Sequence, residues 1–493
     1  MENAAAYDEK FLSGRELGPL PRSVYPNSVH EGVYMSREPD RDVLIAAGKS
    51  DFEGPRFTDA AGTAFVRASL THKNAVILRQ MFPFTAPRRV LGEKCTVGVG
   101  DRLGIATPGH IRAFRRFDAV PVFAQQSIRE LNLTGRTYED VLDAATFAVF
   151  REGFSQTQGF GADGDHLKTP EEVKYALSRG YTIITLDCSE HIRSDAAAMT
   201  DAEVSTAYAS SPWAREPDYL NRSVRLEDGT PLEFGAEDFR RMALIYGKAI
   251  EFAEGIYHSL LKDSVNVDFE ISIDETATPT TPAQHYFVAK ELRDRGVKFA
   301  SLAPRFCGEF QKGVDYVGDA EQFRREFRVH ARIAEHFGHK ISVHSGSDKF
   351  KVFPAVGGET KGRFHLKTAG TSWLEAMRLV AMKDAPLYRE VHRFALSAFE
   401  DARRYYHVSA QAADVPNVES LSDGDLPSLF SRSGARQVIH ITYGLILNAK
   451  AQDGSLLFRD RLFRLWRENE DAYGELLDAH IGGHLEQLRC KAR

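Results

Sequence analysis

The chain has 493 residues, of which 43% are hydrophobic and 27% are charged, and its formal net charge is −6. These values are typical of a globular protein in water, and the negative charge gives no electrostatic argument for binding nucleic acid or an anionic membrane surface. The sequence has no apolar run approaching about 18 residues and no basic, apolar leader at its start, so we expect a cytoplasmic protein.

Residues 1–90 are predicted to form a separate N-terminal α/β cap. Two short apolar runs, at residues 42–48 and 74–79, are bounded by turn-forming residues, so both are expected to be strands. We find no pattern of catalytic or ligand-binding residues in this part of the chain.

From residue 91 onward, short strand-like runs alternate with helix-like segments. Eight such runs lie at residues 95–101, 120–126, 159–165, 181–187, 267–274, 298–306, 340–345 and 363–368. This alternation predicts a (β/α)8 TIM-type barrel at residues 91–383. A doubly wound open sheet is the alternative, but it usually has fewer strands.

Several helix starts can be located from their capping residues. Thr137, Thr169 and Thr281 are each followed three residues later by an acid or an amide, which is the pattern of a capping box. Ser372 precedes Glu375 in the same way. The loops before such helices follow strands, and these loops carry the chemistry of α/β barrels.

Two segments extend the predicted barrel. An insertion at about residues 190–238 contains a predicted hairpin at 224–234 and lies at the rim of the barrel, where it could act as a lid; the sequence leaves open whether it closes over the site. Residues 384–493 show helical periodicity and are predicted to form a C-terminal helical extension packed on the barrel. The chain's cysteines lie far apart, which indicates neither a zinc finger nor a disulfide framework; they are Cys95, Cys188, Cys307 and Cys490.

Alternation along the predicted strands places polar and charged side chains inside the barrel. Apolar residues are expected to face the helices, so the residues between them face inward. The inward set is Thr185, Asp187, Glu270, Ser272, Asp274, Ser342, His344, Arg363, His365 and Lys367. Burying acids, histidines and a lysine together is costly unless they pair or bind a metal or ligand. This convergence predicts a functional site at the carboxyl ends of the strands.

Two histidines at the ends of predicted strands form a candidate metal site. His166 and His344, with a third ligand, would hold a divalent cation and leave a coordination position open. The candidate third ligands are Gln311, Glu309 and Glu270. Asp165, beside His166, is a candidate general base, and Glu270 is a candidate acid opposite it.

At these residues the sequence resembles the tagaturonate/fructuronate epimerase family, from about residue 98 to residue 443. The shared motifs are GVGDRLG at 98–104, FAQQS at 123–127, GFGADGDHLK at 159–168, IDET at 273–276, KISVHSGSDKF at 340–350 and FHLKTAGTS at 364–372. The resemblance implies a barrel fold. It also implies a metal-dependent isomerase that interconverts D-fructuronate and D-tagaturonate at C4 in hexuronate breakdown.

The resemblance further implies roles for individual residues. Asp165 would be the proton acceptor and Glu270 the proton donor. His166, Gln311 and His344 would bind the divalent metal, for which the sequence does not distinguish among Zn, Mn, Ni and Co. Candidate substrate-binding residues are Arg102, Gln125, Asp274, His365 and Lys367, and the candidate cations for the substrate carboxylate are Arg102, Lys349 and Lys367.

The chemistry of the implied reaction favours a particular route. C4 of a 2-ketouronate is β to the ketone, so its hydrogen is not acidic. Retro-aldol cleavage of the C3–C4 bond, rotation of the aldehyde fragment and re-addition would invert C4, and would need a base and an acid for the C4 hydroxyl proton. Two alternatives stay open: a keto-sugar kinase and a non-catalytic sugar-acid-binding protein. The expected partner is a small sugar acid, and a homo-oligomer is compatible with the sequence.

Overall fold

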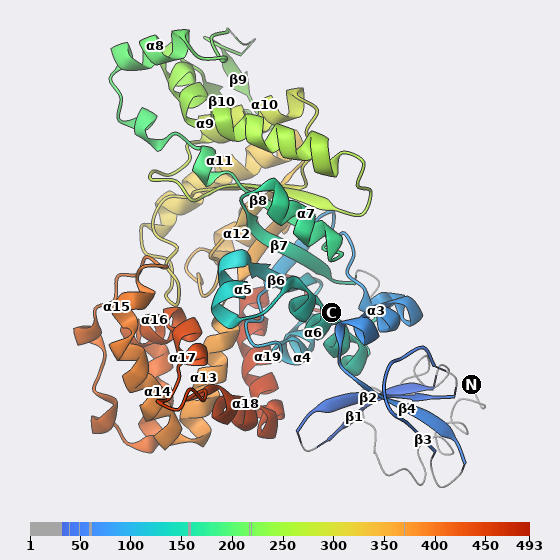
Figure 1. Cartoon of the computed structure of the whole chain (residues 1–493). Helices are drawn as coiled ribbons and strands as arrows, with labels where there is room; N and C mark the ends of the chain where they lie inside the picture. Colours follow the sequence, from blue (N-terminus) through green and yellow to red (C-terminus); the bar gives the residue numbers. More distant parts are fainter. Residues whose placement is uncertain are drawn as a thin grey trace.

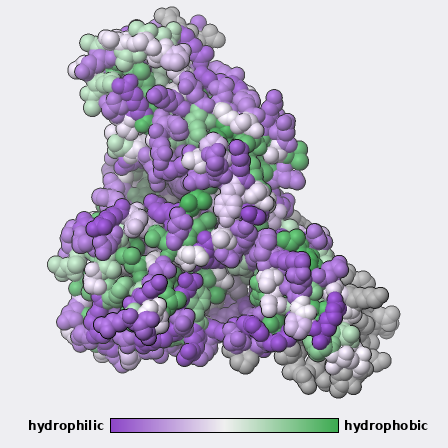
Figure 2. Space-filling view, in the orientation of Figure 1, coloured by the Kyte–Doolittle hydropathy of each residue, from purple (hydrophilic) through white to green (hydrophobic). Residues whose placement is uncertain are grey.

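The structure is a computed structural model that describes residues 32–38, 40–48, 50–58, 62–155, 159–215, 217, 219–368 and 370–493. Residues 1–31 of the predicted cap therefore lie outside the described residues. Figure 1 shows a central barrel, with the N-terminal sheet and the C-terminal helices at one end of the molecule and the insertion, in green, at the other. Hydrophilic side chains cover most of the face seen in Figure 2. Within the described residues, no helix combines the length and apolar character needed to cross a membrane.

The predicted barrel is confirmed. Its strands are β5 (Cys95–Val99), β6 (Val120–Ser127), β7 (Gly161–Leu167), β8 (Ile183–Asp187), β11 (Asp268–Ile273), β12 (Ser301–Pro304), β13 (Lys340–Val343) and β14 (Phe364–Thr368). They close in the order β11-β12-β13-β14-β5-β6-β7-β8, and neighbouring strands run parallel. Each strand overlaps one predicted run. All eight predicted strands are therefore present, because short buried runs between turn residues are typical of parallel sheets.

Helices between the strands form the outer layer of the barrel. They are α4 (Thr107–Arg116), α5 (Ile128–Thr134), α6 (Tyr138–Glu152), α7 (Pro170–Ser178), α9 (Ala236–Ile256), α10 (Pro282–Asp294), α11 (Ala320–Phe337), α12 (Phe353–Glu359) and α13 (Thr371–Lys383). The capping boxes expected at Thr137, Thr169 and Thr281 are present. The expected cap at Ser372 is wrong, because α13 begins at Thr371 after Gly370 in the left-handed conformation.

The N-terminal part is an antiparallel sheet with one helix against it. Its strands β1 (Val33–Arg37), β2 (Asp42–Ala47), β3 (Arg56–Thr58) and β4 (Ala64–Ser69) pair in the order β1-β2-β4-β3. The strand expected at 42–48 is confirmed, but the one at 74–79 is wrong, because this run lies in α3 (His72–Met81). Thr71 caps that helix by accepting a hydrogen bond from the backbone N–H of Asn74. Short apolar runs do not distinguish a strand from a buried helix.

The insertion contains two short 3-10 helices, then α8 (Asp201–Ala209) and a hairpin of β9 (Ser223–Arg225) and β10 (Pro231–Glu233). The predicted hairpin is confirmed. After the insertion the chain forms α9 and continues as a π-helix over Tyr257–Leu261. The insertion packs α8 against α9 and the hairpin against α10, so it covers the outer helices of the barrel.

The C-terminal extension is helical, as predicted. It comprises α14 (Ala385–Ser397), α15 (Phe399–Ala402), α16 (Ser433–Ile441), α17 (Tyr443–Asn448), α18 (Arg459–Glu468) and α19 (Glu470–Gln487), with 3-10 turns between them. Together with α13 these helices enclose a second hydrophobic core that includes Trp373 and Trp466. Helix α19 lies closely against α4: a Cβ atom at Gly109 would stand 2.8 Å from Leu477, so the absence of a side chain permits this approach.

Three buried histidines meet between α10, α11 and the start of β13. The two ring nitrogens of His285 lie 3.1 Å from Nδ1 of His330 and 3.0 Å from Nε2 of His339. Burial lowers the pKa of all three imidazoles, to about 4 for His330 and to about 3 for His339. In the folded chain the three rings are therefore neutral near pH 7 and stay so well below it.

These histidines predict a loss of stability in mild acid. Below about pH 6.5 the unfolded chain binds protons that the folded chain does not, so the free energy of unfolding falls with pH, by about 1.4 kcal/mol per pH unit for each such proton. The stabilisation is complete above about pH 6.5 and declines toward pH 4. Urea unfolding between pH 7 and pH 4.5 measures the slope. His339→Gln is expected to reduce it by one proton, whereas His258→Gln, at an exposed site, leaves it unchanged; equal slopes in all three proteins would contradict this explanation.

Candidate functional site

A pocket of about 240 Å³ lies at the carboxyl end of the barrel. The expected site residues that line it are Gln125, Asp165, His166, Asp274, Gln311, His344 and Lys367. They come from the ends of β6, β7, β13 and β14 and from the loops after β11 and β12. Strand alternation therefore brought most of the predicted residues to one place.

Lys367 is the electrostatic centre of this pocket. Its Nζ lies 2.7 Å from Asp163 Oδ2, 2.8 Å from Asp165 Oδ1 and 2.8 Å from Glu270 Oε1. Asp163, which has no role predicted from the sequence, is thus a counter-charge of this lysine. Burial alone would lower the pKa of Lys367, but the three carboxylates outweigh it and hold that pKa well above its ordinary value. The lysine is therefore a permanent buried cation that joins β7, β11 and β14.

The neighbouring carboxylates respond to the same charge. Burial raises the pKa of Asp163 to about 6, with the Lys367 ammonium opposing the rise. Burial would also raise the pKa of Asp165, but Lys367, His166 and His344 outweigh it and hold that pKa below its ordinary value. The pKa values of two carboxyl groups in one strand, Asp163 and Asp165, are thus shifted in opposite directions. Such opposite shifts are frequent in catalytic sites.

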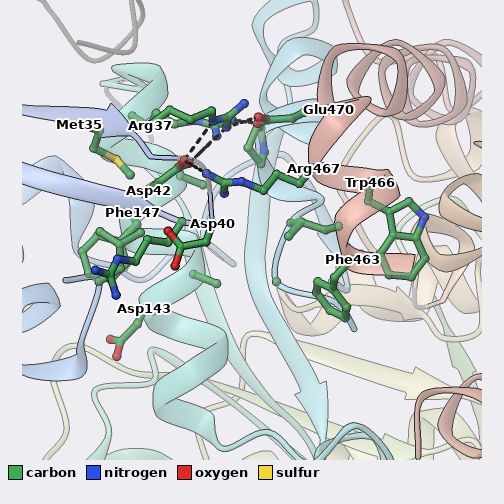
Figure 3. Close-up of a pocket in the computed structure, with 18 of the residues that line it drawn as sticks. Met35, Arg37, Asp40, Asp42, Asp143, Phe147, Phe463, Trp466, Arg467 and Glu470 are labelled. Carbon is green, nitrogen blue, oxygen red and sulfur yellow. Dashed lines mark hydrogen bonds and ion pairs between the residues drawn. The ribbon is translucent and has the colours of Figure 1, made fainter. Parts of the chain in front are cut away.

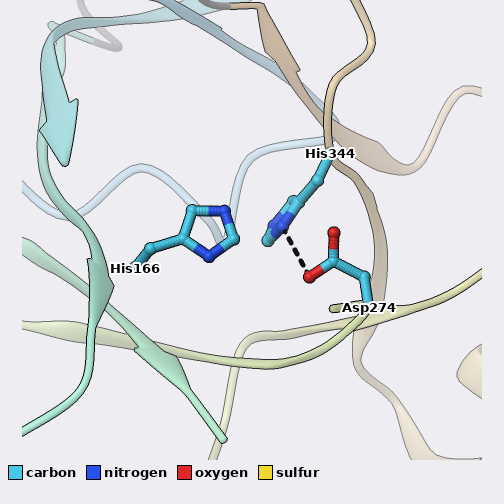
Figure 4. A group of neighbouring side chains, drawn as sticks. All are labelled: His166, Asp274 and His344. Atoms are coloured by element: carbon cyan, nitrogen blue, oxygen red, sulfur yellow. Dashed lines mark ion pairs between the residues drawn. The ribbon is translucent and has the colours of Figure 1, made fainter. Parts of the chain in front are cut away.

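His166, Asp274 and His344 form a compact group beside this lysine (Figure 4). One ligand atom from each residue can be chosen so that all three lie within 4.8 Å of one another. His344 Nδ1 lies 3.3 Å from Asp274 Oδ1, and the two imidazole rings are 4.9 Å apart between centroids. Burial would lower the pKa of His344, but Asp274 and Glu270 raise it to about 10, while the same histidine helps hold the pKa of Asp274 at about 2.

The backbone and a second carboxylate orient these two histidines. His166 has a φ of 53°, in the left-handed region, where the pairing of β7 with β8 shifts register between Gly164 and Leu167. Such a bulge re-aims a side chain, here toward the pocket. His344 Nε2 lies 2.8 Å from Glu270 Oε1, while the Nδ1 atoms of both histidines have no hydrogen-bond partner among the described residues. Glu270 therefore holds His344 with Nδ1 directed toward Asp274.

Gln125 offers a free amide to the pocket. This buried side chain lines the pocket, and neither its oxygen nor its nitrogen has a hydrogen-bond partner among the described residues. A Cβ atom at the neighbouring Gly98 would stand 1.6 Å from Gln125 Oε1, so the glycine makes room for the amide. An unpaired buried amide next to a cavity is costly without a ligand, which supports a role in substrate binding.

Several other expected site residues do not reach the pocket. Glu270 and His365 are fully buried beneath it, and Nδ1 of His365 lies 2.9 Å from Thr96 Oγ1. Arg102 is buried as well; it donates from Nη2 to Glu130 Oε1 at 2.8 Å, and its guanidinium lies 3.7 Å from the centre of the Tyr443 ring. Arg102 therefore ties the barrel to the C-terminal extension.

The candidates for the third metal ligand differ in their surroundings. Gln311 lines the pocket, but its Oε1 accepts hydrogen bonds from Ser409 N at 2.9 Å and from Gln437 Nε2 at 3.1 Å. Glu309 does not line the pocket, and its carboxylate lies 3.9 Å from Arg305. The ligand group of Figure 4 takes its oxygen from Asp274 instead.

The glycine-rich stretch of residues 159–168 is mostly strand rather than a phosphate-binding loop. A Cβ atom at Gly161 would stand 2.7 Å from Val90, and one at Gly164 would stand 3.0 Å from Ala176. These glycines allow β7 to pack closely against neighbouring elements. The only feature that favoured the kinase alternative therefore has a packing explanation.

Three groups of pocket residues have no signal in the motifs. Arg129 on α5, Lys312 in the loop after β12 and residues 405–407 of the C-terminal extension all line the pocket. Residues 190–238 contribute no described residue to the pocket. Residues 405–407 of the extension line it, and hydrogen bonds from Ser409 and Gln437 to Gln311 hold the extension against the barrel.

A larger cavity, of about 1110 Å³, lies between the N-terminal sheet and α18 and α19 (Figure 3). Its charged residues neutralise one another: Arg467 lies 3.1 Å from Asp42, and Arg37 pairs with both Asp42 and Glu470. This cavity contains none of the expected site residues. It is a charged seam between the two ends of the chain, and the chemistry belongs to the smaller pocket.

Comparisons with known proteins identify the family of this chain. A family model of tagaturonate epimerases (UxaE) matches residues 25–488. The chain is 43% identical, over 94% of its length and 96% of the relative's, to the tagaturonate/fructuronate epimerase of Thermotoga maritima. It is also similar to the crystal structures of the fructuronate-tagaturonate epimerase of Cohnella laeviribosi in native and glycerol-bound form, each with a TM-score of 0.92, 45% identity and full coverage of both chains. The chain therefore belongs to the tagaturonate epimerase family, a family of carbohydrate isomerases.

Proposed function

We propose that this protein interconverts D-fructuronate and D-tagaturonate by inverting C4, through retro-aldol cleavage and re-addition. The observation that carries the proposal is the joining of proton-transfer groups and a ligand group in one pocket: Asp165 lies beside His166 and is linked through Lys367 to Glu270. Family membership supports the substrate pair, since the similar proteins named above are fructuronate–tagaturonate epimerases.

The residues of the pocket fit a divalent cation. Two imidazoles and a carboxylate are a donor set suited to such an ion, and the Nδ1 atoms of both histidines make no hydrogen bond within the described residues. We propose His166, Asp274 and His344 as ligands, and Glu270 as the group that fixes the tautomer of His344. Gln311 stays a further proposed ligand, which would exchange the hydrogen bond from Ser409 for the ion. When bound, a divalent cation would supply Lewis acidity at the oxygens of the substrate.

The side chains of the protein divide the proton transfers between them. Asp165 lines the pocket as a carboxylate, so it is the proposed acceptor of the C4 hydroxyl proton during cleavage. Glu270 does not line the pocket, so as the proposed donor it would act through Lys367 Nζ, which lies 2.8 Å from both carboxylates. The unpaired amide of Gln125 is proposed to bind a substrate hydroxyl and so to orient the chain of carbons.

Amide variants test the proton-transfer roles. Asp165→Asn and Glu270→Gln remove a charge while keeping side-chain volume, so each is expected to lower kcat by about 10²–10⁴-fold. Each also removes an ion pair to Lys367, so thermal stability is expected to fall, and activity is compared at a temperature where every variant stays folded. Turnover is measured by NMR of D-fructuronate. Metal content measured on the same samples separates two roles for Glu270: an unchanged content supports proton transfer, whereas a lost metal indicates that it only orients His344. Near wild-type turnover in Asp165→Asn would refute its role.

Metal removal tests the ligand set. Exhaustive chelation is expected to abolish turnover, and added divalent ions are expected to restore it. His344→Asn and Asp274→Asn should each weaken metal binding about 10-fold or more, as followed by competition with a coloured chelator. Glu309→Gln, outside the pocket, is the matched control. Full turnover after metal removal would overturn the proposal of a metal-dependent site.

A further inference from the structure

Two cations face the pocket without a carboxylate partner. Arg129 donates from Nη1 to the carbonyl of Tyr405 at 3.4 Å, and its guanidinium lies 4.9 Å from the centre of the Tyr406 ring. No hydrogen bond or ion pair of the Lys312 side chain occurs within the described part of the chain. By contrast, the ammonium of Lys367 is paired with three carboxylates, and the guanidinium of Arg102 with Glu130. Positive charge is therefore left over at only these two pocket residues.

The leftover charge is costly in this setting. Lys312 is half-buried, and the guanidinium groups of Arg102 and Arg129 lie close enough to repel its ammonium. The nearby Glu130 carboxylate is already held by Arg102. A desolvated cation without a counter-ion destabilises the free protein, and a bound anion removes that cost. An arginine and a lysine that line one pocket also match a carboxylate, which accepts several charge-assisted hydrogen bonds.

We propose that Lys312 and Arg129 bind the carboxylate of the hexuronate substrate; this inference rests on the proposed function. It replaces Arg102, Lys349 and Lys367, the cations expected from the sequence. Lys349 donates to the carbonyls of Gln311, Val314 and Ser347 and is enclosed by backbone. The two proposed residues follow β6 and β12, Arg129 at the start of α5 and Lys312 in the loop after β12, and these strands stand opposite each other in the barrel.

The carboxylate anchor has a consequence for epimerisation. In the retro-aldol step the C3–C4 bond breaks, its electron pair passes to the enediolate of the ketone fragment, and the C4 hydroxyl proton passes to Asp165. The carboxylate stays on the aldehyde fragment. Lys312 and Arg129 therefore hold this fragment while its aldehyde group turns its other face to the enediolate, and re-addition restores the C3–C4 bond with C4 inverted.

Binding measurements test the anchor separately from catalysis. Calorimetric titration of D-tagaturonate into metal-loaded Asp165→Asn protein gives the parent Kd. Adding Lys312→Met or Arg129→Met is expected to weaken binding by about 10–100-fold, the range for a lost charge-assisted hydrogen bond. D-Tagatose, which has a CH2OH group in place of the carboxylate, should bind all three proteins within about twofold. Lys351→Met, at an exposed lysine outside the pocket, is the matched control.

The outcomes separate the two proposals. Unchanged binding of D-tagaturonate in both variants would overturn the anchor, and so would an equal loss of D-tagatose affinity, which would indicate a disturbed pocket. If the wild-type protein fails to invert C4 but binds D-tagaturonate in a way that depends on Lys312, the anchor stands and the proposed function falls.

A second inference comes from the opposite end of the barrel. Cys95, the first residue of β5, and Cys490, just after α19, have their sulfur atoms 3.0 Å apart, although 395 residues separate them in sequence. Both are free thiols; Cys95 is buried and Cys490 is partly exposed. Backbone hydrogen bonds fix this contact, from Asp118 N to Lys491 O at 2.7 Å and from Arg493 N to Arg116 O at 2.9 Å. The geometry points to a reversible disulfide that ties the C-terminal end to the barrel.

Formation of this bond needs an oxidant, for which we name a low-molecular-weight disulfide. The Cys490 thiolate attacks one sulfur of the oxidant and releases its other half as a thiolate. The Cys95 thiolate then attacks Cys490 and releases the second half, so that two protons and two electrons pass to the oxidant. A bond across so long a segment restricts the unfolded chain strongly, so it is expected to stabilise the fold.

Counting free thiols tests the proposed disulfide between Cys95 and Cys490. After treatment of the folded protein with oxidised glutathione and removal of the reagent, the number of titratable thiols is expected to fall from four to two. Peptide mapping should join the segments that contain Cys95 and Cys490. Cys307→Ser should form the same link, and Cys490→Ser should not. Retention of all four thiols, or a link between another pair, would overturn the inference.

Discussion

A single buried ammonium group, that of Lys367, neutralises the layer of polar strand side chains beneath the pocket, which we call its floor. Lys367 neutralises carboxylates from β7 and β11, and these carboxylates in turn contact the histidines of the pocket. Barrel interiors are normally filled with branched apolar side chains. The buried carboxylates at this end of the barrel therefore need a buried cation that neutralises them. Breaking a buried ion pair by removing one partner typically costs about 3–5 kcal/mol. The positions of Asp165, Glu270 and His344 therefore all depend on one side chain of β14.

The pocket is built in two layers with different origins. The floor comes from barrel strands, where alternation and buried hydrogen bonds fix each side chain. The roof comes from loops and from residues 405–407 of the extension, joined to the barrel through Gln311 and Gln437. The two layers also differ in charge. In the floor, Lys367 neutralises the carboxylates. The two cations without a carboxylate partner, Arg129 in a short helix and Lys312 in a loop, lie above the floor.

Much of the floor of the pocket could be predicted from the sequence, whereas its roof could not. Strand alternation is a local property, so it is enough to bring His344 and Lys367 to one site. Arg102 could not be assigned in this way, because its direction depends on Glu130 and on Tyr443, which is more than 300 residues away. The error at residues 74–79 is of another kind, since a short apolar run is compatible with a strand and with a helix until the cap at Thr71 is considered. Residues 405–407 carry no motif, because a loop that covers a pocket needs a matching shape rather than a particular sequence pattern.

The C-terminal extension also affects the order in which the pocket is assembled during synthesis. The barrel closes only when β14 pairs with β5, and the pocket is enclosed only when residues 405–407 and α16 are in place. During synthesis all barrel strands therefore exist before the pocket has its roof, and a polar cavity stands open to water until the last quarter of the chain folds over it. Covering of the pocket is thus the last step in building this site, and changes in the final hundred residues can alter what enters the pocket without disturbing the acids, histidines and lysine below.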